Sequence, residues 1–113
     1  MLVKTLLIIV ALIHFYFFIL ESYLYKTRIG FKTFALNQEK FNHTKIWAFN
    51  QGFYNLCLSI GLIEALITNN KILATYLLSF IIIVGLIGGI SIKIKVFYLQ
   101  ALPAIIALIS IWI

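Results

Sequence analysis

Four long apolar runs, separated by polar joints, dominate the pattern of hydrophobic and polar positions along the chain. A helix needs about 20 apolar residues to cross a hydrocarbon core roughly 30 Å thick. We therefore expect membrane-spanning helices over residues 5–25, 46–67, 72–92 and 96–113. Helices are favoured because a backbone in hydrocarbon must satisfy its own hydrogen bonds. The pattern predicts an all-α integral membrane protein that folds as a four-helix transmembrane bundle.

Two of the polar joints are short and one is long. The joints over residues 69–71 and 93–95 are short enough to make the helices that they connect antiparallel neighbours. The joint over residues 26–45 is basic, and three of its apolar side chains share one helical face: Phe31, Phe34 and Ala35. It is interpreted either as a short helix on the membrane surface or as an irregular loop with aromatic anchors.

The composition supports a membrane protein over a soluble one. Hydrophobic residues make up 64% of the 113 residues and charged residues only 11%. A soluble domain of this size buries only about 60–70% of its surface, so it could not hide so much apolar area. The single cysteine, Cys57, excludes an internal disulfide. No glycine- or proline-rich linker interrupts the chain, and we expect residues 1–113 to form one domain.

The net charge of +6 is distributed around the apolar runs and not on a polar domain, so we expect no nucleic-acid partner. The expected spans place two lysines, Lys4 and Lys71, on one side of the membrane. Seven basic residues fall on the other: Lys26, Arg28, Lys32, Lys40, Lys45, Lys93 and Lys95. The positive-inside rule then predicts a multi-pass protein of the cell (plasma) membrane with both termini outside. The basic joint is predicted to be cytoplasmic and to attract anionic lipid head groups.

Polar residues inside the apolar runs are the candidates for chemistry. A helical rise of about 1.5 Å per residue places Glu21, Asn50, Gln51 and Gln100 in the cytoplasmic half and His14 and Asn55 near the midplane. Tyr54 lies on the same helical stripe as Asn50. The candidate ligand or proton site comprises His14, Glu21, Asn50, Gln51, Tyr54, Asn55 and Gln100.

Glu21 carries the sharpest hypothesis, because a carboxylate within a span costs at least ~2.5–3.5 kcal/mol on insertion scales. One interpretation makes it a proton carrier or a cation ligand. The other makes it structural, neutralised by Lys26 or Arg28 or hydrogen-bonded to Asn50 or Gln100.

The remaining polar candidates also admit two interpretations. His14 is either a proton relay or a neutral histidine bonded to a neighbouring helix. The amides are either interhelical hydrogen bonds or ligand contacts. No catalytic motif and no metal-ligand spacing occurs, so we expect no enzyme activity, no metal and no cofactor.

Small residues and one proline predict how the last two spans pack. Gly85, Gly88 and Gly89 would allow the close approach of the fourth span or of a second subunit, and we expect a homo-oligomer. Pro103 frees the carbonyl of Leu99, so a kink is expected there.

Several motifs together resemble the small bacterial membrane proteins of the domain of unknown function 1304 family. They are His14, Leu20-Glu21, Lys26-Thr27-Arg28, Phe34-Ala35-Leu36, Thr44-Lys45, Asn50-Gln51-Gly52-x-Tyr54-Asn55, Gly61-Leu62 and Gln100-x-x-Pro103-Ala104. The likeness covers nearly the whole chain, although Ser22-Tyr23 departs from the usual choices after the glutamate. It implies four spans and supplies no activity. It also favours a common interior site for the polar residues near the midplane and in the cytoplasmic half.

The leading functional hypothesis is a small-solute or proton-coupled carrier, or a membrane-embedded binder of a small ligand, with Glu21 as the ionisable group. The rival hypothesis is a non-transporting accessory or assembly subunit whose polar layers are structural. A membrane enzyme would need a reactive group that the sequence does not show.

Overall fold

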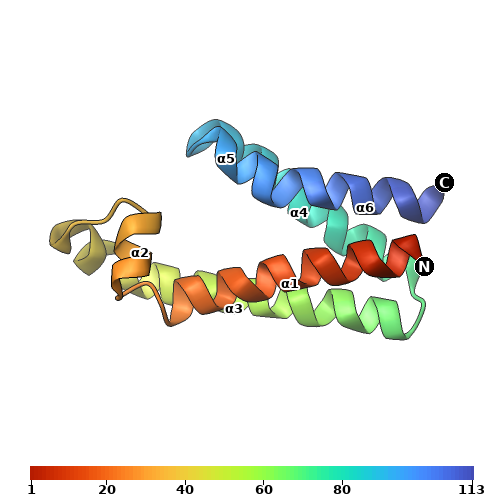
Figure 1. Cartoon of the computed structure of the whole chain (residues 1–113), viewed down its shortest axis with the longest axis horizontal. Coiled ribbons are helices and arrows are strands. Elements are labelled where there is room, and N and C mark those ends of the chain that lie inside the picture. The colour runs from red at the N-terminus through yellow and green to blue at the C-terminus, as the bar shows by residue number, and fades with distance from the viewer. The chain divides into compact units, whose positions relative to one another are not determined.

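The computed structural model describes all 113 residues, and its regular secondary structure is entirely helical (Figure 1). The all-α prediction is thereby confirmed. In chain order the elements are α1 (Leu2–Ser22), α2 (Arg28–Thr33), α3 (Gln38–Ile67), α4 (Lys71–Ser91), α5 (Ile94–Val96), the π-helical turn η1 (Phe97–Ala101) and α6 (Leu102–Trp112).

Three helical stretches are long and apolar enough to cross a membrane: Leu2–Ser22, Lys71–Ser91 and Ile94–Trp112. These correspond to the first, third and fourth expected spans. The longest helix, α3, is not among them. Its polar residues, including Asn50, Gln51 and Asn55, lower its mean hydropathy below that of the other three. The chain therefore has three helices of membrane-spanning length and apolarity, and one longer helix that is more polar.

The long basic joint is more helical than the sequence indicated. Part of it forms the short helix α2 and not an irregular loop, but only Phe31 of the expected apolar face lies inside that helix. Phe34 is the residue at its C-cap, and Ala35 has a φ angle of 52°. A left-handed backbone at Ala35 ends any continued helix, so the expected face of three residues does not form.

The second long helix begins earlier than expected, at Gln38 in place of residue 46. The side-chain oxygen of Asn37 accepts a hydrogen bond of 2.8 Å from the backbone N–H of Lys40. Such a cap satisfies one of the N–H groups that a helix start leaves without a partner. The second half of the joint is therefore an extension of α3.

The residues form two compact units. One comprises Met1–Ile13 and Leu58–Ile113, and we call it the aliphatic unit. The other comprises His14–Cys57, and we call it the aromatic unit. The buried core of the aliphatic unit consists of alanine and branched aliphatic side chains: Leu7, Val10, Ala11, Leu62, Ala65, Ala74, Leu78, Ile81, Ala104, Ala107 and Ile111.

Within the aliphatic unit, α4 runs alongside η1 and α6 (Figure 1). A Cβ atom added at Gly85 would lie 2.7 Å from the backbone nitrogen of Ala101. Gly88 and Gly89 lie close to the side chains of Val96 and Phe97. The three glycines of α4 thus face the segment that follows it in the chain, where the missing side chains allow close approach.

The last membrane-compatible stretch changes its helical register just before Pro103. The backbone N–H of Leu102 bonds the carbonyl of Phe97, which is the five-residue spacing of a π-helix. Proline has no N–H to donate, so the α-helical bond to the carbonyl of Leu99 is missing. The wider π turn over Phe97–Ala101 precedes this break, and Gln100 lies within it.

The aromatic unit is held by rings and hydrogen bonds. The rings of Phe18 and Phe53 lie 5.1 Å apart, and the hydroxyls of Tyr25 and Thr44 are 2.7 Å apart.

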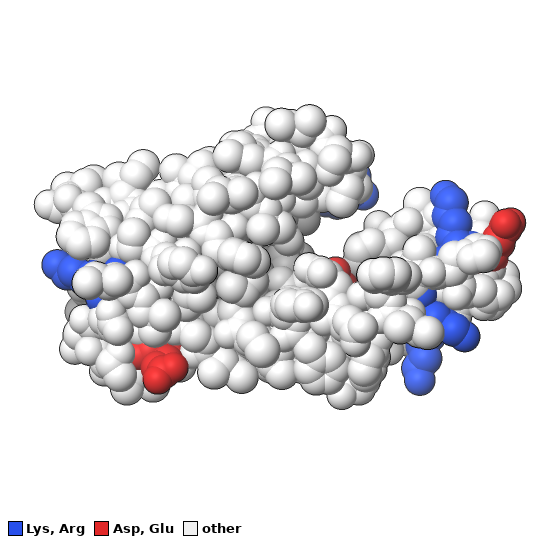
Figure 2. Space-filling model, turned by 180° about the vertical axis from the view of Figure 1, so that it is seen from behind, with Lys and Arg blue, Asp and Glu red and all other residues white.

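Lys and Arg side chains gather around α2 and the start of α3, whereas the middles of the helices are largely without charge (Figure 2).

Candidate functional site

The candidate site is a carboxyl–amide pair in the aromatic unit. The Nδ2 atom of Asn55 on α3 donates a hydrogen bond of 2.5 Å to Oε1 of Glu21 on α1. The same nitrogen lies 3.4 Å from the carbonyl oxygen of Gln51 on its own helix. Asn55 is only 4% exposed, and Glu21 is half-buried. One carboxyl is therefore held from the neighbouring helix by a buried amide.

The direction of the side chains explains why these two residues meet. In this unit α1 and α3 are antiparallel, since Phe18 contacts Phe53 while Ser22 bonds the carbonyl of Phe49. That register puts the backbone of Glu21 near the level of Asn50, several residues from Asn55. Helical side chains lean toward the N-terminus of their own helix. In antiparallel helices the two leans converge, so Glu21 and Asn55 meet between their backbone levels.

The chemistry of the pair follows from its neutral partner. An amide N–H can donate to a carboxylate and also, more weakly, to the carbonyl oxygen of a protonated carboxyl. Asn55 therefore does not dictate the charge of Glu21, whereas a lysine or arginine at the same place would favour the ionised form. The pair can hold the side chain in one position while a proton is gained or lost.

The second carboxyl oxygen is accessible. Every buried side-chain nitrogen or oxygen has a hydrogen-bond partner, and the bond from Asn55 engages only Oε1 of Glu21. Oε2 therefore reaches the accessible surface of the chain. Its free lone pairs are available to a proton, a cation or the donor group of a ligand.

The other predicted site residues lie in different surroundings. His14 is buried, 1% exposed, and its ring meets that of Phe17 edge to face at 5.4 Å. Asn50, Gln51 and Tyr54 are exposed on α3. Gln100 is half-buried in the π turn of the aliphatic unit. The contacts thus join Glu21 and Asn55 directly, and they join neither of them to the side chain of Asn50.

Sequence reasoning missed the residues that set the helix spacing beside the pair. The hydroxyl of Ser22 donates a 3.0 Å hydrogen bond to the carbonyl of Phe49. A Cβ atom added at Gly52 would lie 3.0 Å from the carbonyl oxygen of Phe18 and would meet Ser22 as well. The available signal was one small residue on each helix, Ser22 on α1 and Gly52 on α3.

Three helices long and apolar enough to cross a membrane, and a carboxyl–amide pair between α1 and α3, characterise this small all-helical protein. The chain belongs to the family described as "Protein of unknown function (DUF1304)", which matches residues 8–112 and so includes both Glu21 and Asn55. The chain is also similar to the uncharacterized protein YpaA of Lactococcus lactis subsp. lactis (strain IL1403). That protein is 32% identical over 107 residues, which cover 91% of this chain and 90% of the relative. No solved structure matches the chain.

Proposed function

We propose that this protein is a four-span plasma-membrane carrier that couples a small solute to protons, with Glu21 and Asn55 at its binding site. The observation that supports this most is a half-buried carboxyl within a membrane-compatible helix, bonded to an uncharged partner. Ionisable residues inside spans are rare because of their insertion cost, and they commonly mark ion or substrate pathways.

The mechanism uses the two carboxyl oxygens of Glu21 differently. Asn55 holds Oε1 in both protonation states. Oε2 gains a proton from one side of the membrane, which neutralises the site, and loses it on the other side. The ionised carboxylate then attracts a small cation, and the next proton displaces that cation. Proton and cation share one acceptor, so their movements are coupled in opposite directions.

The proposal includes α3 as the fourth span. Its 30 residues are about 45 Å long at 1.5 Å per residue, enough to cross a bilayer. Exposed Asn50, Gln51 and Tyr54 would be costly against lipid tails. A second copy of the chain, covering this polar face, would remove that cost, so we propose a homo-oligomer. Cross-linking of the reconstituted protein would show a monomer alone if this part were wrong.

The proposed orientation places both termini outside and the α2 end in the cytoplasm. The gathering of Lys and Arg around α2 supports it, because basic segments are retained on the cytoplasmic side and attract anionic head groups there (Figure 2). In a Cys57→Ser background, the accessibility of single cysteines added at either terminus in intact cells tests this orientation.

The function is tested by flux measurements in liposomes. Purified wild type, Glu21→Gln and Glu64→Gln are reconstituted with an internal pH-sensitive dye, and an outward proton gradient is imposed. Sodium, potassium and tetraethylammonium are then added outside in separate runs. Glu64→Gln is the matched control because it removes an exposed carboxyl by the same chemical change.

We expect wild type and Glu64→Gln to dissipate the gradient faster with at least one cation. Glu21→Gln should show only the leak of protein-free liposomes. Wild-type flux in Glu21→Gln would overturn the assignment of the site. The absence of cation-dependent proton movement in wild type would count against the carrier itself.

A non-transporting accessory subunit is the second candidate. It is favoured by the fact that the Glu21–Asn55 hydrogen bond joins two helices, which is also what a purely structural bond would do. This candidate predicts a stoichiometric partner protein that co-purifies with wild type, and it predicts no coupled flux from the protein alone.

A further inference from the structure

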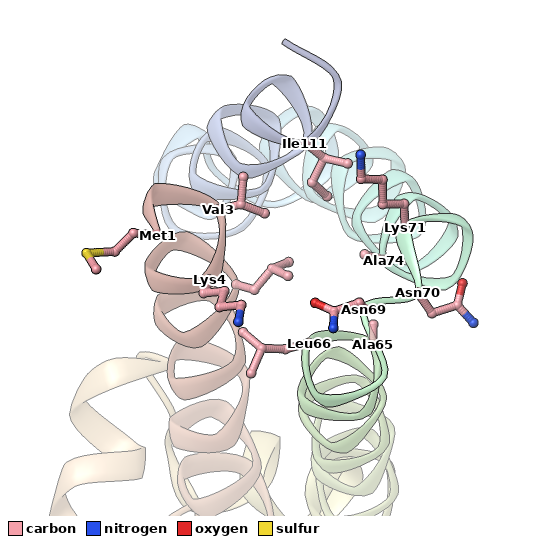
Figure 3. A pocket seen from close by; sticks show the side chains of 11 residues that line it. Met1, Val3, Lys4, Ala65, Leu66, Asn69, Asn70, Lys71, Ala74 and Ile111 are labelled. Carbon is pink, nitrogen blue, oxygen red and sulfur yellow. The ribbon is translucent and has the colours of Figure 1, made fainter.

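A pocket of about 250 Å³ lies at one end of the aliphatic unit, where the helix ends meet (Figure 3). The start of α1 contributes Lys4 and Leu7, and the turn between α3 and α4 contributes Asn69. The first residues of α4 contribute Lys71 and Ala74. This pocket belongs to neither the carboxyl–amide pair nor the basic joint.

The wall of the pocket is apolar and firmly packed. Four of its lining residues are almost fully buried, between 2% and 7% exposed: Leu7, Ala65, Ala74 and Ile111. Two of them are alanines, whose short side chains leave the space open. An apolar wall of this kind favours a hydrocarbon group over water.

The rim of the pocket is cationic and polar. Figure 3 shows the side chains of Lys4 and Asn69 pointing toward one another across the opening. Lys71 adds a second positive charge, and no acidic residue lines the pocket. Asn70 is already engaged, because its side chain caps α4 by accepting from the N–H of Leu73. An anion at the rim would meet the ammonium of Lys4 and the amide of Asn69, while the charge of Lys71 lies farther off, over the ring of Trp112.

The pocket lies at a depth suited to a lipid head group. The three membrane-compatible stretches begin or end beside it, at Leu2, Lys71 and Trp112. The ammonium of Lys71 lies 5.8 Å from the centre of the Trp112 ring, and the indole N–H bonds the hydroxyl of Thr75 at 2.8 Å. Tryptophan and lysine both favour the boundary between lipid and water.

We propose that this pocket binds an anionic phospholipid, with the phosphate between Lys4 and Asn69, the charge of Lys71 nearby and the first carbons of an acyl chain against the apolar wall. The volume corresponds to roughly eight groups of the size of a water molecule, at about 30 Å³ each. That space accommodates a phosphate and a short piece of chain, while the rest of the lipid stays in the bilayer.

Trp112 provides a local reporter for the test. The chain has two tryptophans, so Trp47→Phe leaves Trp112 as the sole one. This background is reconstituted in vesicles of phosphatidylcholine with increasing phosphatidylglycerol, one of the two carrying brominated acyl chains. Bromine quenches nearby indole fluorescence, so the two labelling schemes give the preference for the anionic lipid beside the pocket.

Charge variants decide whether the lysines of the pocket are responsible. Lys4→Gln/Lys71→Gln removes both, and Lys93→Gln/Lys95→Gln removes two exposed charges outside the pocket as the matched control. A lysine at an anionic surface contributes a factor of about five, so we expect a fall in preference of about 25-fold in the first double variant. The control should keep the wild-type preference. Equal losses in both double variants would overturn the proposal.

Two further arms separate the possible sources of the anion. Added inorganic phosphate should leave the preference unchanged if the ligand is a lipid. If inorganic phosphate, at the same concentration as the anionic lipid, abolished the preference, the pocket would be a site for a free anion. That result would overturn the lipid proposal. Ala74→Leu, which fills the apolar wall without changing charge, should lower the preference. An unchanged preference in this folded variant would show surface attraction alone and would also contradict the proposal.

Discussion

The aliphatic and aromatic units join their helices by different means. In the aliphatic unit, Gly85 brings α4 against Ala101, and small and branched side chains fill the core. In the aromatic unit, ring contacts and hydrogen bonds connect the helices, and among them is the Glu21–Asn55 pair. Lipid tails are as apolar as leucine, so helices in a membrane associate through close packing or polar bonds. The aliphatic unit relies mainly on close packing, and the aromatic unit adds polar bonds that chemistry can use.

The largest effects are expected where packing is closest, at one glycine in each unit. Gly85→Ala places a methyl group 2.7 Å from the backbone nitrogen of Ala101. Gly52→Ala places one against the hydroxyl of Ser22 and 3.0 Å from the carbonyl oxygen of Phe18. Overpacking costs typically ~1–3 kcal/mol, and a backbone cannot move aside as a side chain does. Alanine recovers about 1 kcal/mol of helix propensity. We expect a net loss of up to about 2 kcal/mol in unfolding free energy, measured by denaturant titration in detergent.

Gly61→Ala is the matched control for these two variants. Its added methyl group meets only the end of the flexible Leu77 side chain, at 2.8 Å. Rotation of that side chain relieves the contact, and alanine gains helix propensity, so Gly61→Ala should be at least as stable as wild type. A control as unstable as the other two variants would show that the backbone contacts are not the cause.

The next effect is expected in the polar pair itself. Asn55→Ala removes the donor from Glu21 and leaves a half-buried carboxyl without its amide partner. An unsatisfied buried polar group costs ~1–3 kcal/mol, and hydrogen bonds between membrane helices are worth ~0.6–1.7 kcal/mol. We expect a loss of about 1.5 kcal/mol in the same titration. Asn50→Ala, at an exposed position of the same helix, should change stability little.

A smaller effect is expected at the α2 end of the aromatic unit. Tyr25→Phe keeps the ring contacts with Phe34 and Phe41 but removes the hydroxyl that pairs with Thr44 at 2.7 Å. Because Thr44 also donates to the carbonyl of Lys40, its own hydroxyl retains a partner. The loss should be about 1 kcal/mol. Tyr23→Phe removes an exposed hydroxyl and should have no effect, so equal losses would contradict this account.

The smallest effect is expected for one polar bond within the aliphatic unit. Ser59→Ala removes a 2.8 Å hydrogen bond from the serine hydroxyl to the carbonyl of Ala11. That carbonyl keeps its helical partner, so we expect a loss of only about 0.5 kcal/mol. A loss larger than that of Asn55→Ala would reverse the comparison between the two units.

The apolar runs predicted most of the helix positions. The turn at residues 69–71 separates α3 from α4 as expected, since α3 ends at Ile67 and α4 starts at Lys71. The start of α3 was missed because the cap at Asn37 is one local hydrogen bond, which apolar periodicity does not report. For the region before Pro103, the sequence predicted the lost hydrogen bond to the carbonyl of Leu99 and a kink, but not the π turn. The sequence does not reveal how the backbone adjusts to that lost bond.

The candidate site was predicted in part. Counting residues along the expected spans singled out both Glu21 and Asn55. It placed Glu21 in the cytoplasmic half and Asn55 near the midplane, and it offered Asn50 or Gln100 as the partner of the carboxyl. Counting along a helix locates backbone atoms, whereas a hydrogen bond depends on where side chains end. The opposite leans on antiparallel helices bring Glu21 to Asn55. Such a pairing needs the register between the helices, which one sequence does not supply.

The central claim is that Glu21 is an ionisable site group held by Asn55 and not a structural necessity. The most direct test is thermal melting of purified wild type and Glu21→Gln in one detergent, with Asn55→Ala beside them. Glutamine keeps an oxygen that accepts from Asn55 and removes the charge, so we predict that Glu21→Gln melts at or above wild type. A Glu21→Gln protein that melts as low as Asn55→Ala would contradict the claim and make the pair structural.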